Sequence, residues 1–189
     1  MLRRSTWMVL VLALASGCTS THLVNTWRDP SFAGPIEFKK VLAVAVRPDD
    51  TTRRTAEDAM VRQIGTGRCV AGYQVVNEAD RVDASRLLEK AKSLNADGLI
   101  TMRIISVRVE STWEPGFAPY YNRAVVAPPA YLEVDRTVRV ETRIYSVSEE
   151  KLIWSGLSDT VDLSSIDKSI EEISKAVRDE LRKEELLVG

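Results

Sequence analysis

The sequence predicts an α/β fold: a single mixed sheet with a parallel start, a following antiparallel hairpin and a C-terminal helix. Short apolar runs alternate with amphipathic helical stretches up to residue 113, in a β-(β-α-β-α-β) order typical of parallel strands joined by right-handed crossovers. Beyond residue 130, apolar and polar residues alternate instead, which is typical of antiparallel strands with one solvated face. A last stripe of apolar residues at helical spacing predicts the final helix.

Two strands open the predicted fold. Residues 22–28 predict the first strand, which ends at Asp29 and Pro30. The apolar run at 41–46 is short and continuous, and it predicts a strand that is buried on both faces.

A first helix is predicted directly after this strand. Its expected N-cap is Asp50 or Thr51, because short polar side chains accept hydrogen bonds from the first free N–H groups of a helix. Gly65 marks its expected end. Its core stripe consists of residues four apart, namely Ala56, Met60 and Ile64.

A strand, a helix and a long strand are predicted next. Residues 73–76 predict a short apolar strand, and Asp83 is the expected cap of the helix after it. Asn95 is expected to end that helix in a left-handed conformation. Residues 97–113 begin apolar and become alternating, which predicts a long strand that leaves the core. The helix is expected to bury Leu87, Leu88, Ala91 and Leu94.

The second half predicts an antiparallel hairpin and a helix. Residues 131–145 form the first strand, a turn follows at 148–150, and residues 151–161 pair back. Ser164 or Ser165 is the expected cap of the final helix. The apolar face of the strand comprises Leu132, Val134, Val138, Val140 and Ile144, and the helical stripe comprises Ile166, Ile170, Ile173, Val177 and Leu181.

The amino terminus has the pattern of a secretory signal peptide. Arg3 and Arg4 precede an apolar run at 7–15, which is shorter than the roughly 20 residues that span a bilayer. Two cleavage sites compete: an ordinary one after Ala15, and a lipoprotein box at 15–18 that makes Cys18 the first, lipidated residue. The second is favoured, and a multiply acylated Cys18 would hold the chain on a membrane.

This cleavage defines the predicted organisation of the chain. Residues 1–17 are the signal peptide, residues 18–40 hold the anchor, the first strand and a loop, and residues 41–189 form a single α/β domain. Cleavage removes two arginines and no acid, so the mature chain is more acidic than the full sequence, whose formal charge is −1. Such a chain has no basic footprint for nucleic acid, so membrane attachment is expected through the lipid alone.

Cys69 is the second of two cysteines. If Cys18 is lipidated, Cys69 is unpaired in an oxidising compartment. The simplest interpretation is a small buried hydrophobic residue. The alternative is a reactive thiol, for which the neighbouring Arg68 offers weak support.

Catalytic, metal and cofactor sites find little support in the sequence. The single histidine, His22, lies close to the expected anchor, so neither a Ser-His-Asp triad nor a Cys-His pair can be assembled in a core. Zinc ligands are too few, and no glycine-rich phosphate-binding motif occurs. Glu133 and Asp135 could act on a glycan, but cross-strand ion pairs explain their charged face better. We therefore expect no enzymatic activity, no metal and no cofactor.

The segment at 112–131 concentrates aromatic residues and four of the seven prolines. A connection of this length is usually functional or disordered. It could complete the core over one end of the sheet, bind a partner, or contact a membrane or glycan. Aromatic side chains with polar groups are typical of interfaces, which makes the candidate partner-binding residues Trp113, Phe117, Tyr120, Tyr121 and Tyr131.

The order of several short motifs resembles a family of uncharacterised bacterial envelope lipoproteins. These motifs are the lipoprotein box, WRDP at 27–30, FKKVLAVAV at 38–46, RRTAEDAMV at 53–61, ADGLITMRI at 96–104 and KLIWSG at 151–156. The strand order is also similar to that of the amino-terminal domain of the Tol-system propeller protein and of lipoproteins that activate peptidoglycan synthases. That similarity implies protein binding or assembly, although a fold alone does not define a function. Resemblance to lipoproteins of diderm bacteria, with Thr19 after the cysteine, implies the outer membrane.

These observations lead to three expectations for function. The first is a non-enzymatic lipoprotein on the periplasmic face of the outer membrane, which binds an envelope protein partner through residues 113–131. The second is a structural lipoprotein that assembles with copies of itself. The third is a peptidoglycan-binding or glycan-active protein that uses Glu133 and Asp135.

Overall fold

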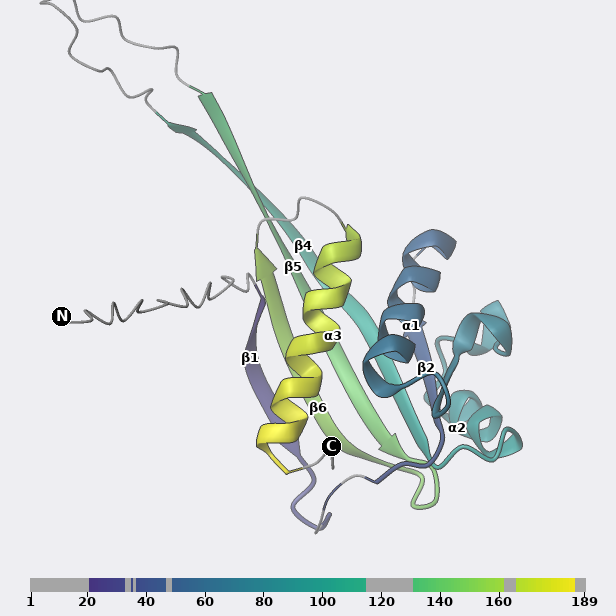
Figure 1. The fold of residues 1–189 in the computed structure, drawn as a ribbon. Coiled ribbons are helices and arrows are strands. Elements are labelled where there is room, and N and C mark those ends of the chain that lie inside the picture. Colours follow the sequence, from purple (N-terminus) through teal and green to yellow (C-terminus); the bar gives the residue numbers. More distant parts are fainter. Residues whose placement is uncertain are drawn as a thin grey trace, which may run out of the picture.

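The structure is a computed structural model that describes residues 21–32, 35, 37–46, 49–114, 131–161 and 166–185 (Figure 1). Its elements in chain order are β1 (Thr21–Arg28), β2 (Val41–Val46), α1 (Asp50–Ile64), β3 (Cys69–Ala71), the 3-10 turns η1 (Gly72–Gln74) and η2 (Glu78–Asp80), α2 (Ala84–Ser93), β4 (Gly98–Glu114), β5 (Tyr131–Ser146), β6 (Lys151–Val161) and α3 (Ile166–Lys183).

One mixed sheet contains the six strands in the order β1-β6-β5-β4-β2-β3. β2 pairs in parallel with β3 and with β4, whereas β4, β5, β6 and β1 are joined by antiparallel pairings. The predicted α/β fold, with its parallel start, antiparallel hairpin and C-terminal helix, is confirmed. β1 is the edge strand next to β6, so the sheet begins at Thr21.

The helices cover the two faces of the sheet unequally. α1 and α3 lie side by side over one face (Figure 1), and their buried side chains share a core with β4, β5 and β6. α2 packs Leu87 and Ala91 into a second core on the other face. β2 contributes alternate residues to both cores, Val41 to the first and Leu42 to the second, as predicted from its continuous apolar run.

The first helix begins one residue earlier than predicted, because its cap is Asp49 and not Asp50 or Thr51. The Asp49 carboxylate accepts the backbone N–H groups of Thr51 at 3.0 Å and Thr52 at 3.1 Å. The hydrogen bonds from Thr52 lower the pKa of Asp49. Gly65 follows the helix with a φ of 116°, a conformation that favours glycine.

The strand predicted at 73–76 was wrong. The strand lies earlier, at Cys69–Ala71, and the chain then turns through Gly72–Gln74. A Cβ at Gly72 would lie 2.9 Å from the carbonyl oxygen of Ala43, so the turn passes too close to β2 for another residue. Val76 is buried without belonging to the sheet, so its apolar character reports burial and not strand pairing.

Most other predicted elements are confirmed. Asp83 caps α2 by accepting the N–H of Ser85 at 2.9 Å, and Asn95 adopts a φ of 54°. The predicted caps Ser164 and Ser165 lie outside the described residues. The described part of the α3 stripe is buried as expected, at Ile170, Ile173, Val177 and Leu181.

β4 and β5 extend past the helices as the β4–β5 ribbon, which comprises residues 104–114 and 131–140 (Figure 1). Its base still pairs with β6, and only its outer part, residues 109–114 and 131–136, is two-stranded. β2 pairs with β4 only as far as Arg103, and β6 pairs with β5 only from Thr137 onward. The pairing of Glu114 with Tyr131 places both ends of the predicted 112–131 loop in strands, so the connection between the strands is 115–130.

Candidate functional site

The β4–β5 ribbon keeps one apolar face, although the residues of β4 on that face change from even-numbered to odd-numbered along the strand. Within the sheet, Met102 belongs to the core beneath α1 and α3. The register of β4 against β5 then shifts between Ile104 and Ser106, as happens where a bulge adds one residue to a strand. Beyond the shift, the odd-numbered residues Val107 and Val109 take the face that even-numbered residues held before it.

The position of Val138 shows that the apolar face of the ribbon lies on the side of the sheet that α1 and α3 cover. It lies opposite Val107 in the register of the two strands, and directly opposite residues of an antiparallel pair share a face. The Val138 side chain packs against the core formed with α1 and α3. The apolar face of the ribbon therefore continues the core face of the sheet beyond the reach of both helices.

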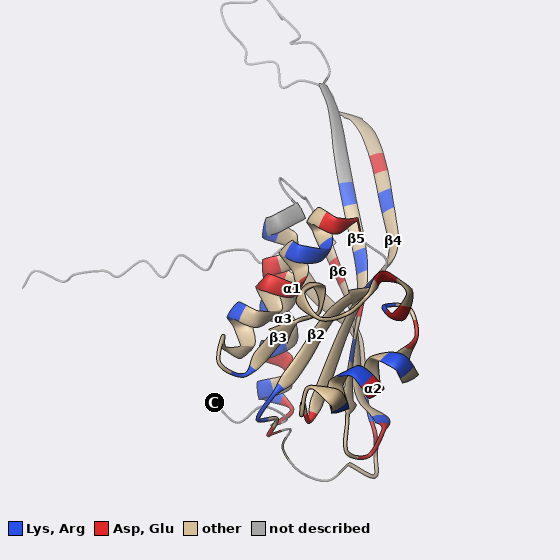
Figure 2. Cartoon of the chain, turned by 90° about the vertical axis from the view of Figure 1, so that its right-hand side faces the viewer, with Lys and Arg blue, Asp and Glu red and all other residues tan. Residues whose placement is uncertain are grey.

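Solvent reaches the apolar side chains on this face. Val107 is 54% exposed, Val109 56% and Trp113 69%. The other face is polar, where the exposed Arg108 and Glu110 form an ion pair at 3.9 Å. Figure 2 shows charged residues along both strands of the ribbon. Arg136 lies opposite Val109 and adds one charge to the apolar face. The ribbon is therefore amphipathic. Val138 and Val140 at its base pack with the core, and no described element covers the apolar side chains of its outer part.

Both edges of the ribbon are also open within the described part of the chain. Beyond Arg103, no described strand pairs with the outer edge of β4, and before Thr137 none pairs with the outer edge of β5. Unpaired N–H and C=O groups along an edge can receive a further strand. Ile104 and Ile105, at the base of the ribbon, are each 44% exposed.

The solvated face of the sheet carries the cross-strand ion pairs that its charge alternation predicted. Glu141 accepts from Arg103 of β4 and from Arg143, each at 2.9 Å. Arg139 donates two hydrogen bonds to Asp159 of β6, at 2.7 and 2.6 Å. These bonds lower the pKa of Asp159 and keep it ionised.

The structure describes only some of the predicted site residues. Trp113 stands on the apolar face of the ribbon, near the end of β4. The backbone of Tyr131 pairs with Glu114, and its side chain lies outside the described residues. Also outside them are Cys18, Phe117, Tyr120 and Tyr121, and the side chains of Glu133 and Asp135.

Cys69 is free and buried in β3, as the simplest interpretation of the sequence predicted. Burial raises the pKa of its thiol to about 12, and the charge of Glu57 adds to this effect. A thiol with such a pKa is a poor nucleophile, so the burial of Cys69 favours the interpretation as a buried hydrophobic residue over that as a reactive thiol.

Sequence reasoning missed a buried polar cluster in α1. Glu57 is fully buried, and its carboxylate accepts the backbone N–H groups of Ala45 and Tyr73. Burial raises the pKa of Glu57, and these two hydrogen bonds, followed by the charges of Arg53 and Arg81, oppose that rise. Both carboxylate oxygens are used by backbone donors, so the cluster joins α1 to β2 and η1. Glu57 lies at a position of α1 that faces the core, but its charge gave no reason to expect burial from the sequence.

The described residues contain neither a cluster of metal ligands nor a membrane-spanning helix. No three His, Cys, Asp or Glu side chains among them come together as metal ligands. None of the helices in the described ranges combines the length and the apolar character of a membrane-spanning helix.

Comparisons with known proteins give only distant likenesses. No protein-family model matches the chain, and no curated protein is significantly similar to it. Among solved structures, the PelC dodecamer from Paraburkholderia phytofirmans shows 16% identity and a TM-score of 0.46, over 84% of this chain and 96% of that chain. A point variant of that PelC shows 14% identity and a TM-score of 0.47, with the same coverage. Lipoprotein GNA1162 from Neisseria meningitidis shows 15% identity and a TM-score of 0.43, over 76% of this chain and 98% of that chain.

Proposed function

We propose that this protein is a non-enzymatic protein-binding module of the cell envelope, and that the apolar face of the β4–β5 ribbon is its contact surface. In this proposal a lipid on Cys18 anchors the chain at the periplasmic face of the outer membrane, and the ribbon extends from the domain toward an envelope protein. Trp113 would be the principal anchor residue of the contact, since tryptophan is enriched among the residues that dominate binding energy.

The observation that carries the proposal is the exposure of an apolar stripe that continues the core face. A two-stranded ribbon in water is marginally stable unless a third strand or another element covers it. Val107, Val109 and Trp113 are more than half exposed, so a partner that covered them would remove apolar surface from water and order the ribbon.

The open edge of β4 supports one mode of contact in particular. A partner strand could extend the sheet along this edge, with main-chain hydrogen bonds supplying affinity and the apolar side chains supplying specificity. The charges of Arg108 and Glu110 lie on the opposite face and would remain in water.

The two open edges support a second candidate function, assembly with copies of the same chain. One edge belongs to β4 and the other to β5, on opposite sides of the ribbon. Different edges that pair head to tail can generate a ring or a filament.

The decisive experiment is crosslinking in cells followed by pull-down of the full-length protein. The test variant replaces the apolar face through Val107→Ser, Val109→Ser and Trp113→Ser. A discrete protein that crosslinks to the wild type and is lost from this variant is the expected result. The same proteins captured in equal amounts by both chains would overturn the assignment of the surface.

A matched control changes the opposite face of the same strand. The control variant carries Arg108→Ser, Glu110→Ser and Thr112→Ser, and it should retain the crosslinked partner. Circular dichroism must show that both triple variants keep the fold, so that lost crosslinking reports contact and not unfolding.

Light scattering of the full chain in detergent separates the two candidates. A monomeric mass at all concentrations excludes self-assembly and leaves the envelope partner. Self-assembly is established if the wild type and the control variant have a mass larger than that of the monomer, while the apolar-face variant has the mass of the monomer.

A further inference from the structure

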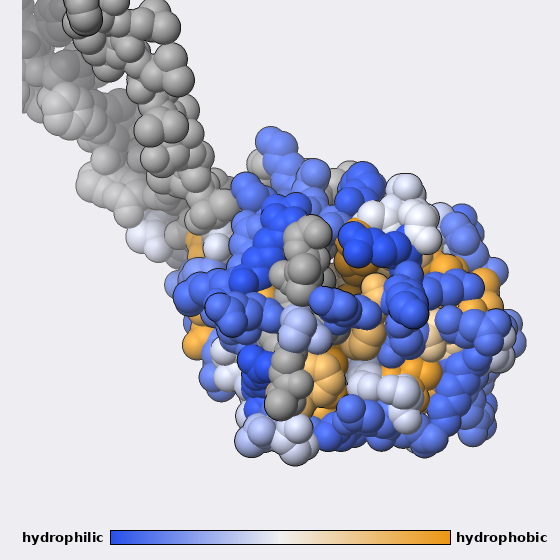
Figure 3. Space-filling model, turned by 60° about the horizontal axis from the view of Figure 1, so that its bottom comes forward, coloured by the Kyte–Doolittle hydropathy of each residue, from blue (hydrophilic) through white to orange (hydrophobic). Residues whose placement is uncertain are grey.

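A cavity separate from the ribbon lies between α1 and α3, near the carboxyl ends of both helices. Its volume is about 460 Å³, which lies within the roughly 300–1,000 Å³ of ordinary ligand pockets. β2, β4 and β5 form its floor, and residues 37–39 and Arg68 lie at its lower end. Figure 3 views this end of the molecule and shows apolar surface between hydrophilic side chains.

The floor and walls of the cavity are largely apolar. Its lining residues come from the same core that α1 and α3 share with the sheet, so the cavity is an opening in that core. An apolar ligand body placed here would replace water against hydrocarbon side chains. The apolar lining comprises Phe38, Val41, Met60, Ile64, Ile100, Met102, Ile144, Val177 and Leu181.

Two buried hydroxyl groups interrupt this apolar lining. Thr142 of β5 is 2% exposed and Ser174 of α3 is 6% exposed, and both line the cavity. Neither hydroxyl has a hydrogen-bond partner within the described part of the chain. Buried polar groups are nearly always paired, and an unpaired one costs about 1–3 kcal/mol. A ligand oxygen inside the cavity would satisfy both groups.

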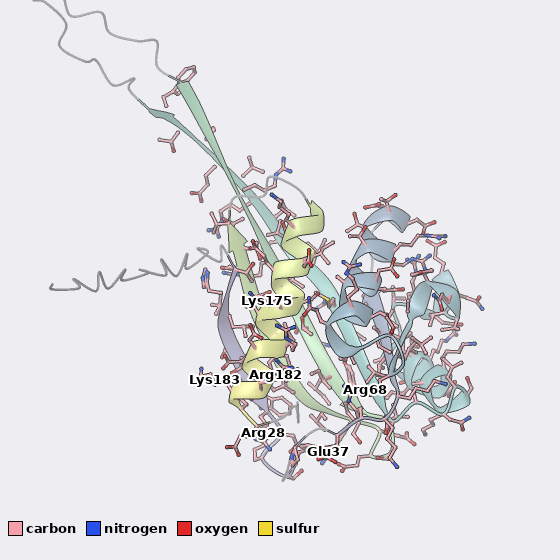
Figure 4. The ribbon with its side chains drawn as sticks, viewed as in Figure 1. Arg28, Glu37, Arg68, Lys175, Arg182 and Lys183 are labelled. Atoms are coloured by element: carbon pink, nitrogen blue, oxygen red, sulfur yellow. The ribbon has the colours of Figure 1, made fainter. Side chains whose placement is uncertain are left out.

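The mouth of the cavity is basic. Lys39, Arg68, Arg178 and Arg182 line it, against the single acid Glu37. Figure 4 shows Arg182 on the lower end of α3, Arg68 below α1 and Glu37 on the segment beneath them. The formal charge of the whole chain is −1, so this gathering of positive charge is local.

Some of that positive charge already has partners. Arg68 donates to the carbonyl oxygen of Ile64 at 3.4 Å, and Arg178 bonds Gln63 and Asp179. The carboxyl ends of α1 and α3 each add about half a negative charge. Four cations still outweigh the two acids, Glu37 and Asp179, and the two helix ends. The side chain of Arg182 makes no hydrogen bond or ion pair with any described residue, so its guanidinium is available to a ligand.

We propose that this cavity binds a single-chain anionic amphiphile. The acyl chain would lie on the apolar floor. The carboxylate or phosphate would accept hydrogen bonds from the guanidinium groups of Arg68 and Arg182, and Thr142 and Ser174 would donate to an oxygen of that same head group. A released fatty acid and a lysophospholipid share this chemistry. The site does not depend on the ribbon or on the function proposed for it.

The test is displacement of a fluorescent fatty acid from the full-length protein in detergent below its critical micelle concentration. Palmitate and lysophosphatidate should each displace the probe, and the stronger of the two identifies the head group as carboxylate or phosphate. A neutral monoacylglycerol should compete about tenfold more weakly, since it lacks the charge-assisted bonds. Failure of both anions to displace the probe, or equal competition by the neutral lipid, would overturn the proposal.

Two variants locate the site, and one controls for charge. Arg182→Glu should weaken palmitate binding by about tenfold. Lys175→Glu makes the same charge change on α3 at an exposed residue outside the cavity lining, and it should bind like the wild type. Thr142→Val should bind more weakly while the free protein becomes more stable, a combination that a purely structural threonine would not produce. Equal binding by all three variants would place the lipid elsewhere and reject the cavity.

Discussion

Glu57 of α1 accepts a hydrogen bond from the backbone N–H of Ala45 in β2, at 3.0 Å, although its side chain is fully buried. The other carboxylate oxygen accepts the N–H of Tyr73. One side chain therefore supplies acceptors to two backbone groups, one near the end of β2 and one in the turn after β3. Glu57 thereby holds α1 against the end of β2 and against the turn that follows β3.

Replacement of Glu57 by alanine should destabilise the protein. Each N–H left unpaired in the interior costs about 1–3 kcal/mol, so we expect Glu57→Ala to lower the free energy of unfolding by about 2–5 kcal/mol in urea titrations. Glu89→Ala, at an exposed acid of α2, should change it by less than about 0.5 kcal/mol. Equal effects of the two variants would contradict a specific role for Glu57.

The pH dependence of the same residue has a definite sign. Burial raises the pKa of folded Glu57 above its ordinary value of 4.5, so the folded state holds the proton more tightly than the unfolded state. Protonation of Glu57 therefore adds to the free energy of unfolding. This addition is fully present below the pKa of Glu57 in the unfolded chain, and it is lost as the pH rises through the pKa of Glu57 in the folded protein. The stability advantage of the wild type over Glu57→Ala should therefore narrow as the pH is raised from below 4.5 through the raised pKa of the folded protein. A gap that widens over this interval would show that the pKa is lowered.

Trp154 imposes a second strict packing requirement. Its indole is fully buried and donates from Nε1 to Glu184 at 3.1 Å. A Cβ at Gly156 would lie 2.3 Å from Trp154 Cη2, so Gly156→Ala should lower the free energy of unfolding by about 1–3 kcal/mol through overpacking. At Gly67 no heavy atom lies within 4 Å of the added Cβ, and Gly67→Ala should have little effect. Thermal unfolding of both variants provides the comparison.

Local periodicity was sufficient to predict most of the fold. The stripe of α3 and the apolar run of β2 are properties of neighbouring residues, and both elements lie where they were expected. The prediction at 73–76 failed because Val76 is buried outside the sheet, and an apolar run reports burial more directly than hydrogen bonding.

Features made by distant residues could not be predicted in the same way. The apolar face of the ribbon depends on a register shift near Ile105, and the sequence shows there only two adjacent isoleucines. The cavity depends on how far α1 lies from α3, which no local pattern encodes. Trp113 was singled out for its aromatic character, and the structure adds its exposure on the same face as Val107 and Val109.

Two buried threonines should respond in opposite directions to the same substitution. The Thr142 hydroxyl has no partner among the described residues, so Thr142→Val should raise the free energy of unfolding by about 1 kcal/mol. The Thr160 hydroxyl lies 2.9 Å from that of Thr21, so Thr160→Val should lower it by about 0.5–1.5 kcal/mol. Urea titration of the free protein measures both changes, and equal signs would show that Thr142 has a hydrogen-bond partner in solution.

The thiol of Cys69 should be inert until the protein unfolds. Its pKa is raised from 9.0 to about 12, which lowers the fraction of reactive thiolate at neutral pH by roughly a thousandfold. Burial within the sheet also blocks access to the sulfur. A thiol reagent such as Ellman's should therefore label this residue slowly in the native protein and rapidly in concentrated urea. The Cys69→Ser variant assigns the signal, because the labelling gained on unfolding should disappear with the substitution. Rapid native labelling that Cys69→Ser abolishes would show that β3 opens readily at this edge of the sheet.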